Sequence, residues 1–164
     1  MKRILIALLA AAMSGVSAFA LEAPTGLVIL TVKGAVTNTN VGDTAAFDFA
    51  MLEKLESRQA VVETPWTTGK TTFEGPLLRA VLQEAGASGK TLTVRALNDY
   101  SAEIPIVDAE IATILAIRQD GQRMSVREKG PMMLVYPFDL EPGLYNEKYF
   151  SRSVWQIKEI EVAK

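Results

Sequence analysis

The sequence predicts a single α+β domain with a mixed order of strands. Short runs rich in valine, isoleucine, leucine and threonine alternate along the chain with two helical stretches, which is typical of this fold class. No low-complexity linker or internal repeat divides the chain, and its 164 residues are the length of one ordinary domain. With 49% hydrophobic and 22% charged residues, the composition indicates a globular protein that buries a core.

The first 20 residues have the features of a secretory signal peptide. Lys2 and Arg3 precede an apolar run over Ile4–Ala12, and Ala18-Phe19-Ala20 has the small-x-small form that signal peptidase recognises. The apolar run is shorter than the roughly 20 residues that span a bilayer, and its Ala-x-Ala ending favours a cleaved peptide over an uncleaved membrane anchor. We therefore expect a signal peptide over residues 1–20 and a periplasmic domain over residues 21–164.

The first half of this domain predicts two strands separated by a helix. Runs of β-branched and apolar residues predict strands over Leu27–Val32 and Ala60–Glu63. Between them, apolar residues at spacings of three and four, from Phe47 to Leu55, predict a helix over Asp43–Leu55.

A loop and the second helix follow. Pro65 and Gly69 predict a loop over Thr64–Gly69. A helix is then expected from Leu77 to Ala85, because Pro76 suits a first helical turn and Gly86 suits a C-terminal cap.

The second half is mostly β. The Asn98-Asp99 and Asp120-Gly121 pairs predict two tight hairpins. We place their arms, and two further strands, at the following ranges: Thr91–Leu97 with Tyr100–Ile106, Ile114–Arg118 with Gln122–Met124, a buried strand over Met132–Tyr136, and a closing strand over Val154–Val162. The closing strand follows a polar loop, and its alternation changes phase at Lys158-Glu159, which predicts a bulge.

Two missing residue types exclude most common catalytic sites. The chain has no cysteine, so it supplies no disulfide, thiolate nucleophile, zinc–thiolate site or iron–sulfur ligand. It has no histidine, which excludes a Ser-His-Asp triad and an imidazole base. The formal net charge of −2 gives no basic surface for nucleic acid, so no nucleic-acid partner is expected.

Two motifs are better explained without a function. Gly69-Lys70-Thr71 ends like a phosphate-binding loop, but Thr64 stands where that loop needs its first glycine, and Pro65 and Trp66 stiffen it. Acidic residues are scattered, have no calcium-loop spacing and are expected to be solvated; they are Asp99, Glu103, Asp108, Glu110, Asp139 and Glu141.

Aromatic residues offer one candidate pocket. Trp66 and Tyr100 each lie next to a turn and could form the walls of a site for a flat heterocycle, with Asn98, Asp99 and Arg152 as polar groups. Trp155 and Phe73 are instead expected to pack in the core. Composition alone leaves packing as the more common role for all of these aromatic residues.

A succession of short motifs makes the reading specific. In chain order they are Trp66, Phe73-Glu74-Gly75-Pro76-Leu77-Leu78, Ala96-Leu97-Asn98-Asp99-Tyr100, Ile104-Pro105, Leu115-Ala116, Asp120-Gly121, Gly130-Pro131, Val135-Tyr136-Pro137 and Arg152-Ser153-Val154-Trp155-Gln156-Ile157. This succession resembles the molybdopterin-binding domain of the sulfite oxidase family. The resemblance covers the chain from about Leu27 onward and implies that family's fold, with a pterin pocket built from the loops that carry the motifs.

One departure from the family changes the expected function. The catalytic members bind molybdenum through one cysteine, and the position of that cysteine corresponds here to Thr64. A neutral hydroxyl is a poor substitute for a thiolate as a ligand of a soft metal. We therefore expect neither catalysis nor a bound metal.

A small exported domain with a pterin pocket and no redox metal looks like the periplasmic pterin-binding proteins that regulate cyclic-di-GMP enzymes. That resemblance implies a reduced pterin or molybdopterin-like ligand. It also implies a partner, the periplasmic domain of a membrane-bound GGDEF/EAL signalling protein, that is, a diguanylate cyclase/phosphodiesterase.

The same resemblance implies roles for seven residues. Trp66 and Tyr100 would stack on the ring, with Thr64 beside it. Asp99, supported by Asn98, would accept hydrogen bonds from the amino and ring N–H groups. Tyr136 and Arg152 would reach the polar side chain or carbonyl of the ligand. The local alternatives are a plain turn at Asn98-Asp99, a core position for Tyr136 and a surface ion pair for Arg152.

Two other functions remain open at this point. The first is a molybdenum-cofactor oxidoreductase or an accessory subunit of one. The second is an interaction module on the same fold with a vestigial pocket.

Overall fold

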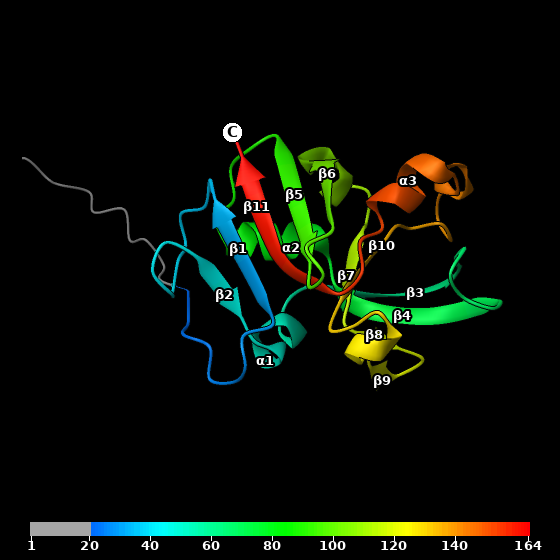
Figure 1. Ribbon diagram of the computed structural model, residues 1–164, viewed down its shortest axis with the longest axis horizontal. Helices are drawn as coiled ribbons and strands as arrows, with labels where there is room; N and C mark the ends of the chain where they lie inside the picture. The colour runs from blue at the N-terminus through cyan, green and yellow to red at the C-terminus, as the bar shows by residue number, and fades with distance from the viewer. Residues whose placement is uncertain (1–20) are drawn as a thin grey trace, which may run out of the picture.

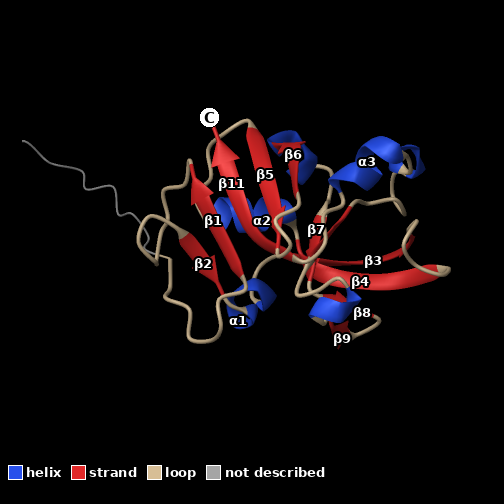
Figure 2. Cartoon of the chain, viewed as in Figure 1, coloured by secondary structure: helices blue, strands red, loops and turns tan. Residues whose placement is uncertain are grey.

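The computed structural model describes residues 21–164, so the predicted signal peptide lies outside the described residues. Its largest element is a five-stranded sheet, in the order β2-β1-β11-β5-β6 (Figures 1 and 2). The strands of this sheet are β1 (Leu30–Gly34), β2 (Ala45–Phe47), β5 (Thr91–Ala96), β6 (Ser101–Pro105) and β11 (Ile157–Ala163). Strand β1 runs parallel to β11, with Thr31 opposite Glu159, whereas the other neighbouring pairs are antiparallel. The predicted α+β class with mixed strands is confirmed.

Two smaller sheets lie on the other side of the molecule. A four-stranded sheet has the order β3-β4-β8-β9, and β7 pairs with β10. Their bounds are β3 (Ser57–Glu63), β4 (Lys70–Pro76), β7 (Ile114–Ala116), β8 (Arg118–Gln119), β9 (Gln122–Arg123) and β10 (Met133–Val135). Three short α-helices and three 3-10 helices complete the described residues 21–164, and Figure 2 shows the helices in blue. They are α1 (Phe49–Glu53), α2 (Leu78–Glu84), α3 (Glu147–Arg152), η1 (Ile106–Ala109), η2 (Val126–Glu128) and η3 (Pro142–Leu144).

The core consists of two hydrophobic clusters. In the first, Leu78, Val81 and Leu82 of α2 pack against inward side chains of the five-stranded sheet, behind which α2 lies in Figure 1. The second cluster joins β3, β4, β7 and β10 to the aromatic residues of the segment that leads into α3. The two clusters meet where β7 and β10 run between the large sheet and the four-stranded sheet.

The predicted strands and hairpins hold where the signal is local. Asp99 has a left-handed φ of 65° in the turn between β5 and β6. Asp120 and Gly121 have left-handed φ values of 49° and 79° in the turn between β8 and β9. The range Ile114–Arg118 is not one arm, however, because β7 turns away to pair with β10 before β8 begins. The bulge predicted at Lys158-Glu159 is confirmed by a register shift between Ile157 and Glu159.

The helix predictions had mixed outcomes. Helix α2 ends before Gly86, whose φ is +61°, as expected, but Pro76 closes strand β4 and Leu77 is the N-cap. The helix over Asp43–Leu55 was wrong in its first half, where β2 pairs with β1 and is buried along its whole length. A fully buried strand shows no alternation, so its Phe47 was counted with the apolar face of α1.

Within residues 21–164, no helix combines the length and the apolar character needed to cross a membrane.

Strand β4 passes so close to β7 that only glycine fits at one position. A Cβ atom at Gly75 would lie 2.0 Å from the carbonyl oxygen of Leu115, and backbone atoms cannot move aside cheaply. Gly75→Ala should therefore lower the free energy of unfolding by about 1–3 kcal/mol, measured by urea denaturation. Gly143→Ala is the control, since a Cβ there meets nothing within 4 Å, and it should change stability by less than about 0.5 kcal/mol. Equal values for the two variants would contradict this account of the packing.

Candidate functional site

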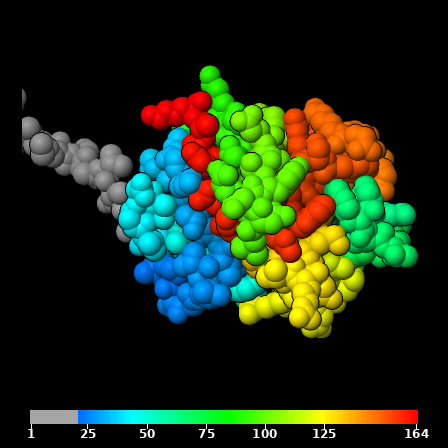
Figure 3. All heavy atoms as spheres, viewed as in Figure 1, coloured from blue at the N-terminus to red at the C-terminus, as the bar shows by residue number. Residues whose placement is uncertain are grey.

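A pocket of about 410 Å³ opens between the β5–β6 turn, the segment after β3, and α3 with the residues that follow it. Figure 3 shows the surfaces near residues 100 and 150 meeting on this face. The lining residues are Trp66, Ala96, Asn98, Tyr100, Glu147, Phe150, Ser151, Ser153, Val154 and Trp155. A cavity of this size is in the range of small-molecule sites, which is about 300–1,000 Å³.

Three aromatic rings form the apolar wall of the pocket. The ring centroids of Trp66 and Trp155 are 5.4 Å apart with their planes at 65°, and those of Trp66 and Phe150 are 6.0 Å apart at 80°. Edge-to-face packing of this kind is favourable and fixes the rings relative to one another. The wall is therefore preorganised for a flat ring system.

The polar lining contains one carboxylate, that of Glu147. The hydroxyl groups of Ser151 and Ser153 donate to the carbonyl oxygens of Lys148 and Tyr149, and the hydroxyl of Tyr100 donates to the carbonyl of Ser151. Within the described chain, by contrast, Glu147 has no ion pair and no side-chain hydrogen bond. Glu147 is the lining residue best able to accept hydrogen bonds from a ligand.

The structure brings three of the seven predicted site residues together in this pocket: Trp66, Asn98 and Tyr100. The side-chain oxygen of Asn98 accepts from the backbone N–H of Tyr100 at 3.1 Å, which stabilises the turn that presents both residues. Thr64 is buried and does not line the pocket. Its Oγ1 lies 2.9 Å from Thr67 Oγ1 and accepts from the Trp66 N–H at 3.3 Å. Its hydroxyl thus holds the turn that carries Trp66.

Asp99 does not line the pocket. Lys158 Nζ donates to Asp99 Oδ1 at 2.7 Å, and this contact lowers the pKa of Asp99. The side chain of Asp99 is 80% exposed.

Tyr136 and Arg152 meet at a third residue, Asp108. Tyr136 Oη and Arg152 Nη1 each donate to Asp108 Oδ2 at 2.8 Å. Burial raises the pKa of Tyr136, and the hydrogen bond to Asp108 raises it further, so Tyr136 stays a donor. The expectation that Asp108 is a solvated carboxylate was wrong, because Asp108 is only 5% exposed.

Sequence reasoning missed the part of the pocket that α3 supplies. Trp155 is 36% exposed in the pocket wall, so the prediction that it packs in the core is wrong. Glu147, Phe150 and Ser151 lie where the sequence predicts only a polar loop. A local signal for this helix is present, because Asn146 caps its N-terminus by accepting from the Lys148 N–H and Glu147 places a negative charge in the first turn.

Residues 40–164 match the family model described as the oxidoreductase molybdopterin binding domain. The chain belongs to this family. Among solved structures, it is similar to the sulfane dehydrogenase SoxCD from Paracoccus pantotrophus, with a TM-score of 0.60 and 19% identity over 82% of this chain and 37% of that one. This likeness shows the fold, and the predicted sulfite oxidase-like fold is confirmed. A search of curated proteins found no match.

The family's description implies a pterin-type cofactor, and the pocket fits the ring part of such a group. It combines rigid aromatic walls with a carboxylate able to accept from an amino-substituted ring edge. The chain supplies no thiolate to hold molybdenum, because the sequence has no cysteine and the Thr64 hydroxyl forms a hydrogen bond within its own turn. In the described part of the chain, moreover, no three Asp or Glu side chains are grouped to hold a metal ion.

The Asp108 cluster should be needed to keep α3 in place. Asp108→Ala leaves Arg152 and Tyr136 without their shared acceptor, and we expect it to lower the free energy of unfolding by about 3 kcal/mol. Glu53→Ala is the control, because Glu53 also pairs with two arginines, Arg118 and Arg123, but is 32% exposed. That variant should lose no more than about 1 kcal/mol. Thermal and urea unfolding of both variants measure the difference, and a loss for Asp108→Ala as small as that for Glu53→Ala would contradict the assignment.

Proposed function

We propose that this domain is a periplasmic, non-catalytic receptor for a reduced pterin, and that it relays the presence of the pterin to the periplasmic domain of a membrane-bound diguanylate cyclase/phosphodiesterase. One observation carries the proposal. The domain has an aromatic pocket for a ring ligand, whereas the chain has no cysteine, and Thr64, which the family resemblance aligns with the metal-binding cysteine, uses its hydroxyl in its own turn.

Recognition of the ring would combine stacking with a carboxylate. The indoles of Trp66 and Trp155 and the phenol of Tyr100 would contact the faces and edge of the bicyclic ring. The guanidine-like edge of a pterin presents two N–H donors side by side, which a carboxylate accepts as a pair. Glu147 is better placed for this than Asp99, because Glu147 lines the pocket and Asp99 is held by Lys158.

Signalling would follow from a shift in population. A ligand changes the output of a partner only if the partner binds the loaded and empty forms with different affinity. Helix α3 is suited to report the ligand, because it supplies Glu147, Phe150 and Ser151 to the pocket and lies on the surface.

The first experiment is to purify the protein from the periplasm and analyse it by fluorescence, mass spectrometry and a molybdenum assay. A bound pterin without molybdenum is the expected result. Bound molybdenum with redox turnover would overturn it in favour of an oxidoreductase or its accessory subunit, which the family membership also allows. An empty protein that binds no added reduced pterin would leave an interaction module with a vestigial pocket.

A comparison of two carboxylates tests the ligand site. Glu147→Gln should weaken binding of tetrahydrobiopterin about tenfold, because a charged acceptor is replaced by a neutral amide that also presents a donor. Asp99→Asn, the matched control, should change the dissociation constant by less than about twofold, since Asp99 lies outside the pocket. Isothermal titration calorimetry under reducing conditions measures both. A larger loss of affinity for Asp99→Asn than for Glu147→Gln would instead assign recognition of the ring edge to Asp99.

A further inference from the structure

Strand β3 is an edge strand with an unpaired side. It is the first strand in the order β3-β4-β8-β9 and pairs with β4 along its whole length, from Ser57 to Glu63. No hydrogen bond in residues 21–164 joins the other side of β3 to a neighbouring strand or loop backbone. Proteins usually protect such an edge with proline or charged side chains. Strand β3 contains no proline, and of its two charged residues Arg58 is paired with Asp139 and Glu63 ends the strand.

The hydrogen bonds of β4 identify which residues face the free side. The carbonyls of Thr72 and Glu74 accept from the N–H groups of Asp120 and Ile117. The backbone groups of Thr72 and Glu74 therefore point away from β3. Backbone N–H and C=O groups alternate in direction along a strand. Those of Thr71 and Phe73 therefore point toward β3, and those of their partners Val62 and Ala60 point toward β4.

Val61 and Glu63 therefore present their N–H and C=O groups to the free edge. Val61 is also 50% exposed.

A groove of about 610 Å³ opens at the C-terminal end of β3. Its other wall is the segment between β10 and α3, which runs beside β3 in Figure 1. The lining residues are Val61, Val62, Glu63, Lys70, Phe138, Asp139, Pro142 and Tyr145. Arg58 donates to Asp139 and so ties this wall to β3 near the start of the strand.

The free backbone groups of β3 indicate which kind of occupant the groove binds. An extended segment that lies beside β3 can accept from the N–H groups and donate to the C=O groups of Val61 and Glu63. A second copy of this chain would bring its own residues 138–145 alongside its β3, which favours an isolated segment over the pairing of two β3 edges.

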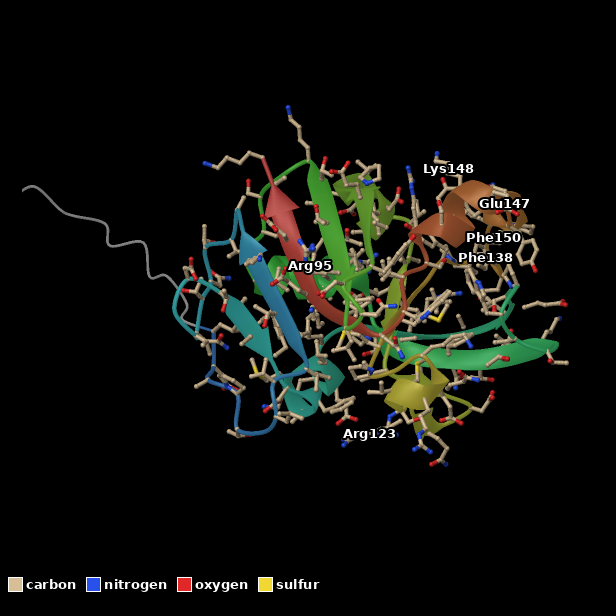
Figure 4. All side chains as sticks on the ribbon, in the orientation of Figure 1. Arg95, Arg123, Phe138, Glu147, Lys148 and Phe150 are labelled. Carbon is tan, nitrogen blue, oxygen red and sulfur yellow. The ribbon has the colours of Figure 1, made fainter. Side chains whose placement is uncertain are left out.

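The groove shares an aromatic wall with the proposed pterin pocket. Phe150 lines the pocket, and Tyr145 and Phe138 line the groove. The ring centroid of Phe150 lies 4.8 Å from that of Tyr145 and 5.9 Å from that of Phe138. Figure 4 labels Phe138 and Phe150 next to each other below α3. Phe150 therefore connects the pocket to two residues of the groove wall, and a ligand in the pocket can act on the groove through this contact.

We propose that the groove binds an extended segment of the signalling partner, which adds to the four-stranded sheet as a strand beside β3 and places an apolar side chain against Phe138 and Tyr145. This inference rests on the proposed function for the identity of the partner and for the effect of the pterin. The strand addition itself rests on the edge of β3 and the groove.

The test uses the full chain and an acetylated, amidated seven-residue peptide of alternating threonine and valine as the probe. Main-chain hydrogen bonds supply most of the affinity in strand addition, so a generic extended peptide is expected to bind. At saturating peptide, the amide protons of Val61 and Glu63 should exchange about tenfold more slowly, whereas that of Ala60, which already faces β4, should not change.

Val61→Pro should abolish the protection at Glu63, because proline removes the outward N–H and is tolerated where that group faces solvent on an edge strand. Val61→Thr, the matched control, keeps the N–H and should bind the peptide like the original chain. Both variants should bind tetrahydrobiopterin normally, since Val61 lies outside the pocket, and this also shows that Val61→Pro is folded.

Three results would overturn the proposal: no protection of Val61 and Glu63 by the peptide, undiminished binding by a folded Val61→Pro, or protection without peptide that rises with protein concentration, which would indicate a second copy. Pterin binding is a separate readout in the same samples. Its failure with intact peptide binding would remove the proposed function and leave the strand-addition site.

Discussion

The pocket depends on one buried ionic contact, in which Asp108 accepts from both Arg152 and Tyr136. These three residues come from η1, from the end of α3 and from the segment after β10, so a single carboxylate joins three parts of the chain. Helix α3 has six residues, too few to be stable alone, and it supplies a large part of the pocket lining. Exchanging a whole buried ion pair for apolar groups changes stability little, whereas removing one partner leaves the other charge buried and unpaired. The contact therefore acts mainly through its directional bonds, which hold α3 against η1 and the segment after β10. Specific placement of the pocket wall is the main effect of this cluster.

Sequence reasoning succeeded where the determinants are local. The Asn98-Asp99 and Asp120-Gly121 turns are encoded by residues that tolerate left-handed backbone, and the end of α2 by Gly86. It failed at β2, where a helix was predicted, and at the pairing of β7, because the partner of a three-residue strand lies far along the chain and is not set by the strand's own pattern.

The candidate site was predicted only in part, because some of its residues adjoin local turns and others are placed by tertiary contacts. Trp66, Asn98 and Tyr100 adjoin turns that the sequence reveals, and all three line the pocket. The partners of Tyr136, Arg152 and Asp99 are set by tertiary contacts with Asp108 and Lys158, to which spacing gives no clue. Glu147 became visible only with α3, since its neighbours in the pocket belong to segments about 50 and 80 residues earlier.

The position of β11 has a consequence for how the protein folds. This strand lies between β1 and β5, although it follows both of them in the chain, and Thr31 pairs with Glu159. Until β11 is inserted, the β1–β2 pair and the β5–β6 hairpin are separate two-stranded units, which are marginal by themselves. Closing so long a loop is entropically costly before its contacts form, so the sheet should assemble slowly and in one late step. The nascent chain would then remain unfolded and without a pocket until these residues have been synthesised.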